Sequence, residues 1–246
     1  MNPALLDAVR FAVCGIGYLT VPLEEFQQDQ MRRGLEIIGT GFLFGPGQVV
    51  TCLHVLTDLR DEMRKRRIPA AQRFAQFGRP GSDGSWEGGL WTFTETDSSE
   101  EVDLAYVSLD DFGKVPWSVP PVRVISNDRP RPQVGDEVAM CGYGHGSGLL
   151  RNAGSQLLER MGPITQHGWI AALGPYDGPG PRALWLDIVA APTASGSPVF
   201  LTETGEVVGV LVEGQEGKNP IVSVATPIVD AGASIAAPRA RLMPFS

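Results

Sequence analysis

Residues 189–200 (V-A-A-P-T-A-S-G-S-P-V-F) join two apolar runs through a tight corner of small residues. Short apolar runs bounded by Gly and Pro favour β-strands. Glycine lets another segment approach the corner closely, and proline helps fix the path of the chain that leaves it. Ser195 therefore stands at a strand–turn–strand junction, where a hydroxyl can be presented to a cleft. Because Ser, Gly and Pro are also the common turn residues, the corner by itself favours an ordinary turn.

Two other stretches supply chemical partners for this serine. His54 follows the apolar run 49–53 and is expected to close a strand, and Asp103 opens the apolar run 104–107. A serine nucleophile needs a base to take its proton, and that base needs a third group to fix its tautomer and stabilise its charged form. The chain order is His, Asp, Ser, with separations of 49 and 92 positions. We interpret Ser195 as the nucleophile, His54 as the general base and then acid, and Asp103 as the orienting carboxylate.

The same stretches resemble blocks of the trypsin/chymotrypsin-like serine protease superfamily, of the bacterial trypsin-like peptidase type. The family's T-A-A-H-C, D-I/L-A-L/V and G-x-S-G-G-P blocks look like T-C-L-H-V, D-L-A-Y and T-A-S-G-S-P here. V-V-G-V-L-V-E-G at 207–214 resembles the strand that binds substrate backbone, and V-A-T-P-I at 224–228 resembles the closing strand of bacterial members. The resemblance implies an all-β fold of two packed six-stranded antiparallel barrels of chymotrypsin type, with the active site in the cleft between them.

The resemblance also implies which residues bind the substrate. Backbone N–H groups of Thr193 and Ser195 would form the oxyanion hole. The base of the primary specificity pocket is expected to be apolar, and burying an unpaired charge is costly. We therefore expect this pocket to accept a small or medium apolar side chain of the substrate. Glu213 at the rim could instead attract a basic side chain. The predicted substrate-binding residues are Val189, Ala190, Val212, Glu213 and Gly214.

Thr193 stands where the family has glycine. That glycine commonly takes a backbone conformation that is costly for a side chain, and a β-branched residue at positive φ is an outlier. Two alternatives follow. In the first, Thr193 is strained by about 1–3 kcal/mol, and the oxyanion hole stays mostly collapsed until substrate or a partner orders it. Thr193→Gly would then raise kcat/KM several-fold. In the second, the corner has re-formed, so that Thr193 is relaxed and the oxyanion hole is intact.

The proline-rich segment 115–121 (V-P-W-S-V-P-P) is the best domain boundary, because proline cannot donate to a central ladder. We expect an N-terminal barrel at 1–118 with His54 and Asp103, and a C-terminal barrel at 119–246 with Ser195. Other expected elements are a strand at 9–21, a loop or short helix at 24–33, a hairpin at 37–51 with its turn at 45–47, a helix at 56–67, irregular hairpins at 74–94, and strands at 134–144 and 184–189.

Charge and cysteine content limit the possible binding partners and the cellular compartment of the protein. Twenty basic and 28 acidic residues give a net charge of −8, which argues against nucleic acid as a partner. The three cysteines lack metal spacing, so we expect buried reduced thiols, no metal and no cofactor. Absence of paired cysteines indicates a reducing compartment, here the cytoplasm. Neither a signal peptide nor a membrane span is evident.

These patterns predict a serine endopeptidase that acts on a protein or peptide substrate through an acyl-enzyme intermediate. Ala194 stands where zymogen-activated members have an acidic residue, which argues against activation by cleavage and leaves activation by a partner protein open. A different class of function is a pseudoprotease that keeps the scaffold and binds an extended peptide by strand addition. An esterase with the same three residues is a further alternative.

Overall fold

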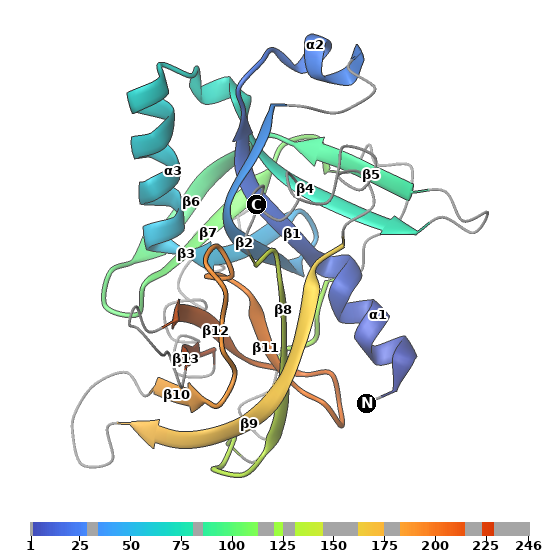
Figure 1. The fold of residues 1–246 in the computed structure, drawn as a ribbon, viewed down its shortest axis with the longest axis vertical. Coiled ribbons are helices and arrows are strands. Elements are labelled where there is room, and N and C mark those ends of the chain that lie inside the picture. The colour runs from blue at the N-terminus through green and yellow to red at the C-terminus, as the bar shows by residue number, and fades with distance from the viewer. Residues whose placement is uncertain are drawn as a thin grey trace, which may run out of the picture.

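The chain folds into two antiparallel sheets, one formed by each half of the sequence (Figure 1). The computed structural model of the protein describes residues 2–28, 34–80, 86–112, 121–124, 131–144, 162–174, 183–214 and 223–228, without the side chains of 79, 80, 86, 87, 213 and 214. The expected domain boundary at 115–121 lies almost wholly outside the described residues, so the division at residue 118 stays a prediction.

The N-terminal sheet has seven strands in the order β5-β4-β1-β2-β3-β7-β6 and is curled (Figure 1). All its neighbouring strands are antiparallel. Its strands are β1 (Val13–Leu19), β2 (Leu35–Gly45), β3 (Gln48–Cys52), β4 (Arg73–Pro80), β5 (Trp86–Trp91), β6 (Phe93–Ser99) and β7 (Leu104–Leu109). Six strands were expected here; the seventh arises because residues 73–99 supply three full strands rather than irregular hairpins.

The C-terminal sheet is a closed six-stranded barrel in the order β10-β13-β12-β11-β8-β9. Its strands are β8 (Glu137–Gly142), β9 (Ile164–Gly174), β10 (Ala183–Leu186), β11 (Pro198–Leu201), β12 (Val207–Gly214) and β13 (Ser223–Pro227). Closure pairs every strand on both sides, so this barrel has no free edge. The two sheets together confirm the expected all-β fold of chymotrypsin type.

The first helix was missed. The pattern predicts a strand from residue 9, but α1 (Pro3–Ala12) takes residues 9–12 and the strand begins at Val13. Asn2 caps this helix by accepting a hydrogen bond from the Ala4 N–H at 3.0 Å, and Pro3 occupies the first turn, both favourable at a helix start. Val9 and Ala12 are the buried residues of α1. This spacing of three suits a helix, but the surrounding run 8–14 is apolar apart from Arg10, and such a run does not distinguish a helix from a strand.

The expected helix after the histidine is present but begins earlier. It is α3 (Leu53–Arg66), and Leu56, Leu59 and Met63 lie on its buried face. Its early start places His54 in the first helical turn rather than at the end of a strand. Residues 24–28 of the expected loop or short helix at 24–33 belong to α2 (Leu23–Gln28), and residues 29–33 lie outside the described residues.

The basic end of α3 is balanced by acidic side chains of the same helix. Arg64 pairs with Asp61 at 2.8 Å, and Lys65 and Arg66 pair with Glu62 at 3.0 and 3.4 Å. These pairs span three or four residues, the spacing at which helical side chains meet. The basic run is thus a solvated helical face.

The two sheets share one hydrophobic core and meet at the serine corner. One cluster of buried apolar residues includes members of both sheets, among them Ile16, Val138 and Val208. The Thr40 N–H of β2 donates to the Ser195 carbonyl at 2.8 Å. Gly196 has a φ of 89°, and a Cβ there would lie 1.8 Å from the Thr40 carbonyl oxygen. Only glycine fits this approach without movement of one of the two chains.

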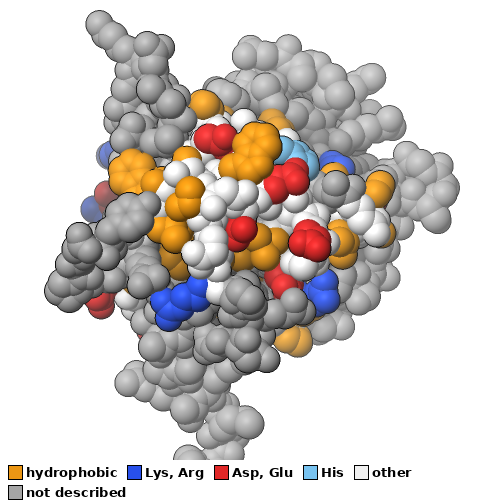
Figure 2. All heavy atoms as spheres, turned by 90° about the horizontal axis from the view of Figure 1, so that it is seen from below, with side chains coloured by type: hydrophobic (Ala, Val, Ile, Leu, Met, Phe, Trp, Pro, Cys, Tyr) orange, Lys and Arg blue, Asp and Glu red, His pale blue; other side chains and the backbone are white. Residues whose placement is uncertain are grey.

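The face seen from below in Figure 2 carries hydrophobic and acidic side chains side by side. The most exposed large apolar side chains of the described residues are Trp169 and Val134, at 53% and 51%. Among the helices in the described ranges, none is both long enough and apolar enough to cross a bilayer.

Candidate active site

His54 and Asp103 form a close, directed pair. The His54 Nδ1 donates to the Asp103 Oδ2 at 2.5 Å, and the His54 backbone N–H donates to the Asp103 Oδ1 at 3.0 Å. The side chains are 39% and 31% exposed, so the pair opens to solvent. Because the carboxylate holds the ring proton on Nδ1, the His54 Nε2 is the nitrogen that can accept a proton. This is the arrangement that a general base requires.

Asp103 owes its position to an unusual backbone. Its φ is 51°, in the left-handed region that Asp tolerates better than most residues. Its carbonyl accepts from the Leu53 N–H at 3.1 Å and its own N–H donates to the Glu100 carbonyl at 3.4 Å. The start of β7 is thereby tied to the start of α3, and the carboxylate is held beside His54.

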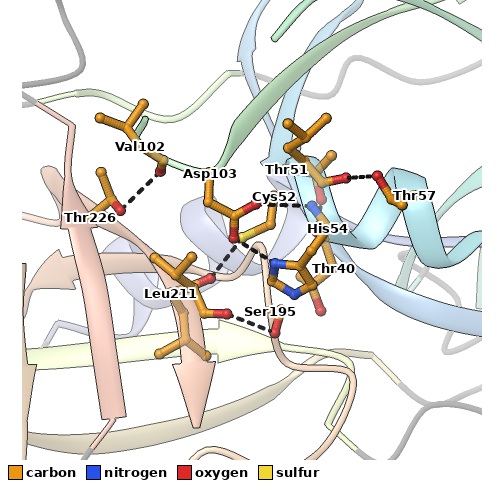
Figure 3. Close-up of polar contacts among 12 residues, drawn as sticks. Thr40, Thr51, Cys52, His54, Thr57, Val102, Asp103, Ser195, Leu211 and Thr226 are labelled. Atoms are coloured by element: carbon orange, nitrogen blue, oxygen red, sulfur yellow. Dashed lines mark hydrogen bonds and ion pairs between the residues drawn. The ribbon is translucent and has the colours of Figure 1, made fainter. Parts of the chain in front are cut away.

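Ser195 lies on the other side of the His54 ring from Asp103 (Figure 3). Its Oγ donates to the Val212 carbonyl at 3.1 Å. The β12–β13 register shifts between Leu211 and Glu213, so Val212 lies at a bulge and has no partner residue in that ladder. A hydroxyl carries one proton, and here it points to Val212. The structure thus brings the three predicted residues together, with the serine proton turned toward β12.

The segment before Ser195 is a tight turn across Pro192 and Thr193. The Ala194 N–H donates to the Ala191 carbonyl at 3.1 Å, which closes the turn. Thr193 at its third position has a φ of 70°. A type II turn has about +80° there and a type I turn about −90°, so this turn is type II. The alternative in which Thr193 is relaxed is therefore wrong.

The turn type fixes the direction of a backbone donor. Types I and II differ by a flip of the central peptide, here Pro192–Thr193, and the flip reverses the direction of the Thr193 N–H. Neither this N–H nor that of Ser195 donates to an acceptor within the described part of the chain. Both are therefore available to an added oxygen atom.

Threonine side chains surround this turn. The Thr193 Oγ1 donates to the Tyr143 carbonyl at 2.6 Å. The Thr40 Oγ1 donates to the Thr193 carbonyl at 3.1 Å and accepts from the Tyr143 N–H at 3.0 Å. Sequence reasoning placed Thr40 in a strand and Tyr143 in another, but nothing in their spacing marked them as neighbours of the corner.

Cys52 lies directly beside the His54–Asp103 pair and was also missed as a site residue. Its Sγ is buried and donates to the Leu211 carbonyl at 3.1 Å. Burial, and secondly the nearby Asp103 carboxylate, raise the pKa of this thiol well above its usual value. Cys52 therefore stays a neutral thiol. All three cysteines are free and buried, as expected.

Possible metal ligand atoms of Cys52, His54 and Asp103 lie within 4.8 Å of one another. The geometry does not suit a metal ion. Tetrahedral coordination at the usual bond lengths separates two ligand atoms by about 3.3 Å, whereas the His54 Nδ1 and the Asp103 Oδ2 are 2.5 Å apart. A neutral thiol is also a poor metal ligand.

The predicted pocket residues lie around the same corner. Val189 is 49% exposed, while Ala190 and Val212 are partly buried and pack on the core. The Ala190 N–H donates to the Ser223 Oγ of β13 at 3.0 Å, which ties this segment to the barrel. Glu213 and Gly214 are placed at the end of β12, where the structure describes the backbone only.

Comparisons with known proteins agree with this geometry. In a structure search, Rv3671c from M. tuberculosis, a serine-to-alanine mutant in an inactive form, is similar with a TM-score of 0.59 and 16% identity, over 100% of this chain and 97% of that chain. The HtrA-type protease AlgW, solved with a decapeptide, is similar with a TM-score of 0.61 and 16% identity, over 96% of this chain and 67% of that chain. At such identity these structures support the fold.

A search of curated proteins found no match to this chain. The sequence model of the trypsin-like peptidase domain matches residues 39–210, which hold His54, Asp103 and Ser195. That range is well over half of the 246 residues. The chain therefore belongs to the trypsin-like peptidase domain family.

Proposed function

We propose that the protein is a serine endopeptidase in which Ser195 attacks the peptide carbonyl, His54 moves the proton and Asp103 orients the imidazole. The 2.5 Å contact between the His54 Nδ1 and the Asp103 Oδ2, with Ser195 on the other side of the ring, carries the proposal. The Asp103 carboxylate stabilises the imidazolium that forms when His54 accepts the serine proton. His54 then returns that proton to the leaving amine, and water hydrolyses the acyl-enzyme by the same route.

The first step is a rotation of the Ser195 side chain. In the resting structure its proton points to the Val212 carbonyl at 3.1 Å. We place this carbonyl among the groups that bind substrate backbone. A substrate N–H that donates to it competes with the serine hydroxyl, and the displaced hydroxyl can then turn toward the His54 Nε2. Apo geometry of this kind commonly tightens when substrate binds.

The N–H groups of Thr193 and Ser195 form the proposed oxyanion hole. Two donors with no other acceptor in the described chain can stabilise the negative charge on the tetrahedral intermediate, where such donors contribute most. Val189, Ala190 and Val212 would line an apolar primary pocket. Protein or peptide is the proposed substrate, without a cofactor, and three buried free thiols suit a reducing compartment such as the cytoplasm.

Steady-state hydrolysis of a fluorogenic peptide library and of unfolded casein tests the function. Ser195→Ala and His54→Ala should each lower kcat/KM by about a thousand-fold or more, and the double variant should lose no more, because the residues act as a unit. His167→Ala is the matched control, since His167 lies on β9, is 47% exposed and contacts Glu137 at 3.9 Å instead. It should retain full activity.

Three outcomes would contradict the proposal. A folded parent protein that binds peptides without cleaving them would indicate a pseudoprotease. Cleavage of esters without cleavage of peptide amides would indicate an esterase. Peptide cleavage that survives His54→Ala would remove this histidine from the mechanism.

A further inference from the structure

Thr193 holds a backbone conformation that its own residue type disfavours. A φ of 70° is uncommon for any residue other than glycine, and a β-branched residue there is an outlier. Pro192 suits the second position of type I and type II turns alike, so it does not choose between them. Contacts beyond the turn must therefore hold Thr193 in the type II form.

Two hydroxyl groups make those contacts. The Thr193 Oγ1 donates to the Tyr143 carbonyl at 2.6 Å, which anchors the side chain. The Thr40 Oγ1 donates to the Thr193 carbonyl at 3.1 Å, which anchors the backbone on the other side of the Cα atom. When the Cβ and the carbonyl carbon are both fixed, tetrahedral geometry at the Cα also fixes the backbone nitrogen. A flip of the planar Pro192–Thr193 peptide turns it about the line between its two Cα atoms, and the nitrogen lies off that line. The flip that would release the strained φ therefore displaces this nitrogen, and both hydrogen bonds oppose the movement.

Thr40 suits this role because its hydroxyl is used twice. It donates to the Thr193 carbonyl and accepts from the Tyr143 N–H at 3.0 Å. Thr40 is fully buried, its carbonyl accepts from the Thr51 Oγ1 at 2.6 Å, and its N–H donates to the Ser195 carbonyl at 2.8 Å. A side chain without a hydroxyl would leave polar backbone groups of Tyr143 and Thr193 short of a partner.

We infer that Thr193 and Thr40 are positioning residues, whose hydroxyls form a latch that keeps the Thr193 N–H aimed into the oxyanion hole before substrate binds. The inference rests on the proposed function and deepens it: a threonine replaces the glycine of the family, and hydrogen bonds replace glycine's conformational freedom. The hole is therefore preformed in the resting protein, and no partner is needed to order it.

Substitutions at residue 193 separate the hydroxyl from the shape of the side chain. Thr193→Val keeps the β-branch and its strain but loses the hydroxyl, so the turn should relax to type I. Loss of an oriented donor should lower kcat by about 10- to 100-fold with little change in KM, because the donor acts on charge that develops in the transition state. Thr193→Ser keeps the hydroxyl and should stay within about threefold of the parent protein.

Thr193→Gly should also stay within about threefold, because glycine takes the third position of a type II turn without strain. Thr202→Val is the matched control: Thr202 is buried and its Oγ1 donates to the Glu137 carbonyl at 3.4 Å, away from the corner. It should lower thermal stability without lowering kcat. A purely structural role for Thr193 would give the same pattern as this control, with unchanged kcat, and would overturn the latch.

A crystal structure of Thr193→Val provides a readout that needs no catalysis. We expect a negative φ at residue 193, with the peptide that follows Pro192 flipped. A φ that remains near +70° in this variant would overturn the inference even if the parent protein were inactive. An inactive parent protein with the expected flip would count against the proposed function alone.

Discussion

Replacement of Gly196 by alanine should destabilise the junction between the two sheets. The new Cβ would lie 1.8 Å from the Thr40 carbonyl oxygen and 2.7 Å from the Thr51 Oγ1. Because the nearer atom belongs to backbone, rotation of a side chain cannot relieve the contact. The serine corner and β2 must move apart.

Three contributions make up the free energy of unfolding that Gly196→Ala is expected to lose. A side chain at a φ of 89° costs about 1–2 kcal/mol. Separation of the chains also weakens the hydrogen bonds from the Thr40 N–H to the Ser195 carbonyl and from the Gly196 N–H to the Leu211 carbonyl. At about 1 kcal/mol each, the loss in free energy of unfolding reaches about 3–4 kcal/mol. For a chain of this size, that lowers the Tm by about 6–16 °C.

Gly135→Ala is the matched control. Gly135 has a φ of 92°, but a Cβ added there would meet no atom within 4 Å, so this variant carries the backbone cost alone. Thermal unfolding followed by circular dichroism should place the Tm of Gly196→Ala below that of Gly135→Ala by about 4–8 °C, the part due to about 2 kcal/mol of lost hydrogen bonds. Equal Tm values for the two variants would refute the reasoning about this close approach.

Three further predictions concern the site and the core. Asp103→Asn should lower kcat by about 10⁴-fold in the peptide assay, and a loss below tenfold would contradict its orienting role. Burial raises the pKa of Cys141 to about 12, so its thiol keeps its proton in the folded chain above pH 9 and loses it on unfolding. The free energy of unfolding should therefore fall by up to about 1.4 kcal/mol per pH unit above pH 9. Urea unfolding measured at pH 8–10 should show that this free energy falls less steeply with pH in Cys141→Ala than in the parent protein. A peptide-library profile should favour small or medium apolar side chains at the primary pocket of Val189 and Ala190, and dominance by Arg or Lys would contradict it.

Local motifs singled out three residues that the structure brings together, because each lies at the edge of a regular element with a strong local pattern. Asp103 directly precedes β7, and Ser195 lies in the corner before β11. The strand at 207–214 has the bounds of the stretch that resembles the family's substrate-binding strand. Local sequence was less informative at the N-terminus, where the same apolar residues suit a strand and an amphipathic helix.

Contacts between distant segments could not be predicted in the same way. Thr40 lies 153 positions from Thr193 and 103 from Tyr143, and no local pattern connects them. From the sequence, Thr193 predicted either a collapsed hole or a relaxed turn. The structure has a strained turn held by side chains, so we no longer expect Thr193→Gly to raise kcat/KM.

Covalent labelling tests the central claim most directly. A fluorophosphonate probe reacts with a serine that a neighbouring base activates, and intact-mass and peptide mass spectrometry locate the adduct. We expect one adduct on Ser195 of the folded protein, lost in Ser195→Ala and strongly slowed in His54→Ala. An adduct that survives Ser195→Ala, or a folded protein that the probe does not label, would contradict the account.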